Sequence, residues 1–293
     1  MAAVRPMAWD EKVGCVAAAA PAPWSRAGSA RTWRLTVADN KPYPPYPEGM
    51  ILLVEVGSTA HGTGLSGGED HDETAVVLES PHQALGLGPA LENHMQRTQP
   101  EGHRSGPGDT DRQVYSLRKF LAMAAAGNPS ILLTLWAPVI ETSDLGRDLI
   151  ALRDAFVGRH VLPRYQGYMQ SQVMRMQGLK GSGHGRRGGG KREELIADHG
   201  YDTKFAMHAA RLGYQGHELV TSGGLTLPVG GAAGDWLRAV RRGEVPYDEW
   251  LARVGELDVT LGALAEDDQY PAGPDRDRIE AFSVATHRRA WGW

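Results

Sequence analysis

Residues 51–58 read Ile51-Leu52-Leu53-Val54-Glu55-Val56-Gly57-Ser58, and after eleven intervening residues the chain continues with Asp70-His71-Asp72. The apolar run predicts a buried strand that ends at the Gly-Ser pair. The segment from Asp70 to Leu78 ends in four apolar residues and predicts a second strand. Because residues two apart in a strand project to the same face, Asp70 and Asp72 should point in the same direction.

This spacing of carboxylates indicates a metal site. Two neighbouring carboxylates repel each other unless cations lie between them. Mg²⁺ prefers oxygen ligands and commonly binds one or two carboxylates together with substrate phosphates. Asp70 and Asp72 therefore predict a site for two Mg²⁺ ions, with Mn²⁺ as an alternative, that acts on a phosphoryl group. At the preceding turn, Gly57 would let a phosphate approach closely, and Ser58 and nearby backbone N–H groups would hold its oxygens.

Three blocks of the sequence resemble a known family. Gly57-Ser58-Thr59-Ala60-His61-Gly62-Thr63, followed by Asp70 and Asp72, resembles the signature of the DNA polymerase β-like nucleotidyltransferases. The resemblance is narrower to the bacterial and phage branch described as RNA-repair-pathway polymerase β-like proteins. It continues in Ser116-Leu117-Arg118-Lys119-Phe120 and Gly127-Asn128-Pro129-Ser130, and again from Gly200 to Gly213. The matching region runs from about Met50 to Leu227.

The resemblance implies a mechanism and a set of residues. An acceptor hydroxyl would attack the α-phosphorus of an NTP, and pyrophosphate would leave. Asp70, Asp72 and a third carboxylate, Asp111, would hold the metals, with Asp109 as the substitute for Asp111; alternatively, Asp111 only caps the next helix. Gly57, Ser58 and His61 would contact the nucleotide, although His61 could equally pack.

A second cluster consists of Lys204, His208 and Arg211, whose spacing of four and three residues predicts one face of a helix. By spacing alone such a basic face is more often solvated than functional. The resemblance implies instead that it neutralises triphosphate charge, while His208 could equally be a core histidine. Asp202 fits the N-cap of this helix.

The order of predicted elements favours an α+β fold. A small mixed sheet with flanking helices, at residues 50–140, would be the catalytic head, and residues 141–293 would be mainly helical. Predicted strands cover 51–56, 70–78 and 111–115, helices begin at Ser116 and beyond Asp144, and residues 81–108 have the composition of a loop. Residues 1–49 lack periodicity and predict a flexible extension.

Composition restricts the functional class. The formal net charge is −4, so RNA would have to bind through a local patch rather than through overall charge. One cysteine, Cys15, excludes an intrachain disulfide. We find no apolar run long enough to span a membrane, and the short Val13–Ala20 segment follows two acids, so a cytoplasmic protein without membrane contact is expected.

Some interpretations stay open at this level. Residues 180–192 carry five cations and no acid, which fits either a flexible linker or a clamp for a polyanion. His71 and Glu73 depart from the family pattern, which keeps a non-catalytic nucleotide- or RNA-binding protein as an alternative. A third hypothesis takes His71-Asp72 as the HD dipeptide of helical metal phosphohydrolases. The acceptor could be RNA, a protein side chain or a small molecule.

Overall fold

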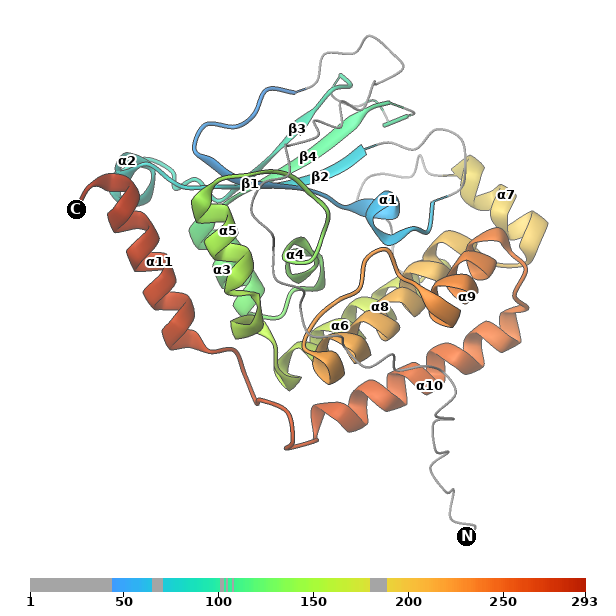
Figure 1. The fold of residues 1–293 in the computed structure, drawn as a ribbon. Helices are drawn as coiled ribbons and strands as arrows, with labels where there is room; N and C mark the ends of the chain where they lie inside the picture. The colour runs from blue at the N-terminus through green and yellow to red at the C-terminus, as the bar shows by residue number, and fades with distance from the viewer. Residues whose placement is uncertain (1–43, 65–70, 101–102, 104, 107, 180–188) are drawn as a thin grey trace. The chain divides into compact units, whose positions relative to one another are not determined.

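The computed structural model describes residues 44–64, 71–100, 103, 105, 106, 108–179 and 189–293. All of these belong to one compact unit that spans Asp39–Trp293. The unit contains a five-stranded mixed sheet with helices against it (Figure 1), which confirms the predicted α+β fold. None of the described helices is both long and apolar enough to cross a lipid bilayer.

The sheet has the strand order β3-β4-β2-β1-β5. Its strands are β1 (Met50–Glu55), β2 (His71–Val77), β3 (Asn93–Arg97), β4 (Thr110–Ser116) and β5 (Val139–Thr142). β2 and β4 are parallel, and every other neighbouring pair is antiparallel. The three strands expected from the sequence correspond to β1, β2 and β4.

The two faces of β2 have different surroundings because its side chains alternate. Val76 faces the main core with Leu117 and Phe120 of helix α3 (Leu117–Ala125). Asp72 and Thr74, at even spacing from Val76, point to the same side. Glu73, Ala75 and Val77 point to the other side, where the small second core lies.

Glu73 is half of a buried ion pair on that other face. Its Oε2 accepts a hydrogen bond of 2.8 Å from Nε of Arg112, its register partner on β4. The Arg112 guanidinium also donates to the carbonyls of Pro44 and Pro45 and lies over the ring of Tyr46. Arg112, paired with Glu73, therefore ties Pro44–Tyr46 to the sheet, although only Pro44 of residues 44–49 is buried. Residues 1–43 of the expected flexible extension lie outside the described residues.

We expect Glu73→Gln to lower the free energy of unfolding by about 2–3 kcal/mol, because it removes the charged partner of a buried guanidinium that keeps its carbonyl acceptors. Urea denaturation measures this change. The matched control is Glu92→Gln: Glu92 forms an exposed bridge with Lys119, whose loss should cost less than about 1 kcal/mol. Equal losses in the two variants would mean that Glu73 has no structural role.

Beyond the sheet the chain is mainly helical. Three helices, α6 (Leu162–Met176), α8 (Thr203–Ser222) and α10 (Tyr247–Ala265), pack side by side (Figure 1). Asp202 caps α8, as predicted, by accepting hydrogen bonds from the backbone N–H groups of Lys204 and Phe205. The remaining helical segments are α1 (Gly57–His61), α2 (Pro81–Leu85), α4 (Pro129–Thr134), α5 (Asp144–Ala151), η1 (Arg153–Phe156), η2 (Arg159–Val161), α7 (Gly189–His199), α9 (Gly231–Arg242) and α11 (Arg276–Trp291).

Several elements differ from the sequence-based expectation. Residues 81–108 contain α2 and β3 rather than loop alone, and β5, α7 and α11 were not predicted. β3 and β5 are edge strands with largely exposed side chains, so they carry no alternation of apolar and polar residues. α2 depends on a capping box between Ser80 and Gln83. α11 buries few residues and is fixed at its end by Trp291, whose Nε1 donates to the carbonyl of Glu79.

Candidate functional site

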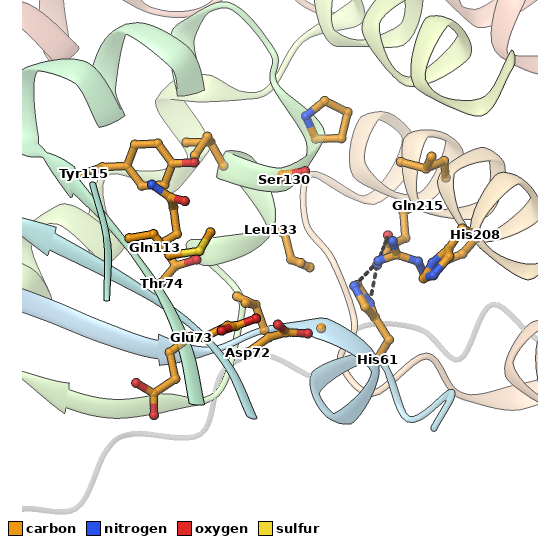
Figure 2. Close-up of a pocket in the computed structure, with 18 residues that line it drawn as sticks. His61, Asp72, Glu73, Thr74, Gln113, Tyr115, Ser130, Leu133, His208 and Gln215 are labelled. Carbon is orange, nitrogen blue, oxygen red and sulfur yellow. Dashed lines mark hydrogen bonds between the residues drawn. The ribbon is translucent and has the colours of Figure 1, made fainter. Parts of the chain in front are cut away.

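A cavity of about 390 Å³ lies between the sheet and the two helices α4 and α8. This volume is within the usual range for small-molecule sites. Figure 2 shows the polar side chains that line it, with Asp72 on one side and His61, His208 and Gln215 on the other. Of the residues predicted for the site, the cavity brings together Gly57, His61, Asp72, Asp111, His208 and Arg211.

Asp72 and Asp111 are direct neighbours on parallel strands. β2 and β4 pair in a register that sets Asp72 opposite Asp111, and both side chains face the cavity. Asp70, the first residue of the predicted pair, lies outside the described residues. Within the described residues no group of three or more His, Cys, Asp or Glu is arranged to hold a metal ion.

The carboxylate of Asp111 already has protein partners. Its Oδ1 accepts a hydrogen bond of 2.8 Å from the Gln99 amide and lies 3.4 Å from Nε of Arg97. Its Oδ2 accepts a hydrogen bond of 2.5 Å from the hydroxyl of Ser105. Asp111 therefore does not cap a helix. The N-cap of α3 is Ser116, whose hydroxyl accepts from the backbone N–H of Lys119.

Asp109, the substitute for Asp111, has a structural role. Its carboxylate accepts hydrogen bonds from the Thr98 hydroxyl and the backbone N–H of Gly106. Its carbonyl accepts a hydrogen bond of 2.7 Å from the N–H of His71. It does not line the cavity.

Gly57 is fitted closely against Asp72. Its φ of +71° is a backbone angle that residues other than glycine rarely adopt, and an added Cβ would overlap the Asp72 carboxylate. The backbone N–H of Val56 donates to the Asp72 carbonyl at 2.8 Å, so the end of β1 and the start of β2 are held together. The short helix α1 begins at Gly57 and carries Ser58, which does not line the cavity, and His61, which does.

His61 is buried and held by α8. Arg211 donates a hydrogen bond to its Nε2, and Gln215 lies 3.3 Å from its Nδ1 (Figure 2). Burial, followed by the positive charge of Arg211 and the neighbouring His208, lowers the pKa of His61 to about 2. His61 is therefore neutral at physiological pH, and it positions Arg211 rather than adding a charge.

His208 and Arg211, in the same wall of the cavity, are both removed from solvent, and this burial lowers their pKa values. Burial, and then the charges of Arg211, Lys204 and Arg241, lower the pKa of His208 to about 3. Burial lowers the pKa of Arg211 to about 10, so its guanidinium stays charged at neutral pH. Lys204, one turn before His208, is exposed and does not line the cavity.

Arg211 has one N–H group for which the described part of the chain offers no acceptor. Its Nε is buried without a hydrogen-bond partner among the described residues, and no carboxylate within them forms an ion pair with it. A buried unsatisfied donor and an unpaired charge both cost free energy. An anionic group in the cavity would satisfy both.

The matching family model covers residues 40–235, about two thirds of the chain. Its description is "RlaP: RNA repair pathway DNA polymerase beta family". The chain belongs to this family. The resemblance seen in the sequence is thereby confirmed, and with it a polymerase β-like nucleotidyltransferase family membership.

Among solved structures, the chain is similar to a nucleotidyltransferase-like protein from Exiguobacterium sibiricum. The identity is 10%, the match covers 75% of this chain and 69% of the other, and the TM-score is 0.26. No curated protein matches the chain.

The geometry of β2 contradicts the hypothesis of an HD-type metal phosphohydrolase. His71 and Asp72 are adjacent in β2, so their side chains project to opposite faces of the sheet and cannot bind one metal together. His71 lies 3.9 Å from the carboxylate of Glu55 on the neighbouring strand. The surrounding elements are strands rather than helices.

Sequence reasoning missed several polar residues of the cavity, among them Gln215, Tyr115 and Thr74. Gln215 continues the spacing of Lys204, His208 and Arg211 by four residues, so the same helical periodicity could have identified it. Tyr115 and Thr74 alternate with buried residues along β4 and β2. Their place in the cavity follows from knowing which face of the sheet the helices cover.

Proposed function

We propose that this protein transfers an NMP from an NTP to an acceptor hydroxyl, with release of pyrophosphate, in a reaction that depends on a divalent metal. The observation that carries this proposal is the side-by-side placement of Asp72 and Asp111 on parallel strands, facing a cavity that also contains the Arg211 guanidinium, with which no carboxylate of the described residues forms an ion pair. One wall thus offers oxygen ligands to cations, and another offers a positive charge to a phosphate.

The residues present fit a metal. Asp72 and Asp111 supply hard oxygen donors, and the missing Cβ of Gly57 keeps the space beside Asp72 open. Together with Asp70, they would hold two Mg²⁺ ions, or Mn²⁺. When bound, such ions neutralise phosphate charge and favour a deprotonated acceptor hydroxyl.

Arg211 and its neighbours would bind the triphosphate. The guanidinium is held by His61 and Gln215, so its direction is fixed before substrate arrives, and less free energy is lost in ordering it. Ser58 and the backbone of Gly57 would contribute further phosphate contacts. Lys204, which is exposed on the same helix, would act as a longer-range charge.

The acceptor we favour is RNA, in accordance with the description of the family. The basic segment 180–192, the other candidate contact for a polyanion, lies largely outside the described residues.

A second candidate function is a nucleotide-binding protein that retains the fold without catalysis. The contacts of Asp111 with Arg97, Gln99 and Ser105 favour it, because they occupy oxygens that a metal would need. A catalytic Asp111 must exchange these partners for the metal.

Incubation with each α-³²P-labelled NTP, Mg²⁺ and total cellular RNA or protein tests the proposal. Label on an acceptor identifies both the nucleotide used and the class of acceptor. Nucleotide binding without any transfer of label, with all NTPs and both acceptor pools, would favour the binding protein instead.

We expect Gly57→Ala to abolish transfer, because the added Cβ displaces the Asp72 carboxylate. The positive φ should also cost about 1–2 kcal/mol of stability. The matched control is Gly223→Ala, which has a φ of +75° and nothing within 4 Å of the added Cβ. It should show the same loss of stability and full activity. Equal activities in the two variants would contradict the role of Gly57.

A further inference from the structure

A second cavity, of about 430 Å³, lies along one face of α6 and shares no lining residue with the first. We call it the α6 groove and define it by Arg164, Gly167, Tyr168, Gln172 and Arg175. The spacing of four between Arg164, Tyr168 and Gln172, and three more to Arg175, places these side chains on one side of the helix. From Arg164 to Arg175 the groove runs about 16 Å along the helix axis.

The chemistry of the α6 groove is cationic and aromatic. α6 carries two arginines and no acidic residue over Leu162–Met176. Arg164 is exposed, and no carboxylate among the described residues pairs with it. The Tyr168 side chain is 37% exposed, so part of its ring is open to a stacking partner. Gly167 leaves the middle of the groove open, since nothing lies within 4 Å of where its Cβ would be.

The α6 groove adjoins the candidate active site. The hydroxyl of Tyr168 accepts a hydrogen bond of 3.0 Å from the amide of Asn128. Asn128 is the N-cap of α4, and the next residues, Pro129 and Ser130, line the first cavity. In Figure 2, Ser130 and Tyr115 lie on the side of that cavity away from His61. A ligand in the groove would therefore reach the cavity beside α4, opposite the phosphate-binding wall.

We propose that the α6 groove binds the acceptor, as single-stranded RNA whose end enters the cavity past Ser130. This inference rests on the proposed nucleotidyl transfer. The exposed Arg164 guanidinium at one end of the groove would contact a backbone phosphate, and the ring of Tyr168, one turn further along the helix, would stack on a base. An acidic peptide would use the same Arg164 cation, but it has no need for an exposed ring beside it.

Binding of a fluorescein-labelled, short single-stranded oligoribonucleotide to the full chain, followed by fluorescence anisotropy, tests the groove. Tyr168→Ala should weaken binding at least fivefold, while Tyr168→Phe, which keeps the ring, should bind within twofold of the native protein. Arg164→Gln should weaken binding and lower the slope of log K against log salt by about 0.7, the value for one phosphate contact. Gly167→Glu, which places an acid in the open middle of the groove, should weaken binding most.

The matched control is Arg288→Gln. Arg288 is an exposed arginine on α11, which packs against α3, and no carboxylate of the described residues pairs with it. It should bind RNA with the native affinity and salt slope. Circular dichroism melting of each variant separates loss of the groove from loss of folding, and Gly167→Ala, which only adds a methyl group in open space, should behave as the native protein.

Two further outcomes separate this inference from the proposed function. If the native protein transfers label to RNA while Tyr168→Ala and Gly167→Glu bind and use RNA normally, the groove is overturned and the transferase stands. The RNA assignment of the groove is also overturned, and the transferase stands, if an acidic peptide binds in the groove and RNA does not. If the groove variants lose RNA binding but the native protein transfers no label, the groove stands as an RNA site and the transferase fails. Binding of Mg²⁺–NTP should be unchanged in all groove variants.

Discussion

Asp72→Asn is expected to lower the rate of nucleotidyl transfer by about a thousandfold or more, equivalent to about 4 kcal/mol of transition-state stabilisation. Asparagine has the shape of aspartate, so packing against Gly57 and the hydrogen bond to the Asp72 backbone should persist. The substitution removes the negative charge that holds the metal. Metal-dependent phosphoryl transfer relies on the bound metal to neutralise charge on the phosphates. The measurement is the single-turnover rate at saturating Mg²⁺ and NTP.

The control for this substitution is Asp277→Asn, an exposed acid in the first turn of α11 that should retain the full rate. The thermal midpoint of Asp72→Asn should not fall, because the substitution removes the repulsion between the neighbouring carboxylates of Asp72 and Asp111 in the metal-free protein. A rate within threefold of the native value would exclude Asp72 as a metal ligand.

Arg211→Gln is expected to lower kcat/KM for the NTP by about a hundred- to a thousandfold without lowering the thermal midpoint. The charge is buried in the cavity wall, its Nε has no partner among the described residues, and burial lowers its pKa to about 10. In the protein without nucleotide such a charge is unfavourable, whereas a phosphate converts it into a charge-assisted hydrogen bond. Glutamine can still donate to His61, so the local contacts are kept.

The combination of a lower kcat/KM with a thermal midpoint that does not fall makes this substitution informative. Arg288→Gln, the exposed control, should change neither quantity. A lower midpoint for Arg211→Gln, with normal kinetics, would assign Arg211 to the core of the protein rather than to the substrate.

Much of this site could be predicted from the sequence because its strands are buried and its turn is unusual. The apolar runs of β1 and β2 flank Gly57-Ser58, and the expected third carboxylate proved to be the register partner of Asp72. The helix that carries His208 and Arg211 was predicted from spacing, and the structure extends it to Ser222. These features depend on local periodicity, which can be read directly from the sequence.

Other features depend on tertiary contacts that no local pattern records. Glu73 looked like a departure from the family, but it balances Arg112, which lies 39 residues away and is buried on the same face. β3 and β5 are edges, and their exposed side chains give no periodic signal. The α6 groove likewise depends on Asn128 lying next to Tyr168, 40 residues apart in the chain.

The most direct test of the central claim compares the fate of two labels. The native protein is incubated with Mg²⁺, acceptor RNA and the same NTP, labelled with ³²P either at the α- or at the γ-phosphate, beside Asp72→Asn. The account predicts that α-label appears on the acceptor, that γ-label appears in pyrophosphate in equal amount, and that Asp72→Asn produces neither. Release of γ-label as inorganic phosphate, or transfer of γ-label to the acceptor, would contradict it.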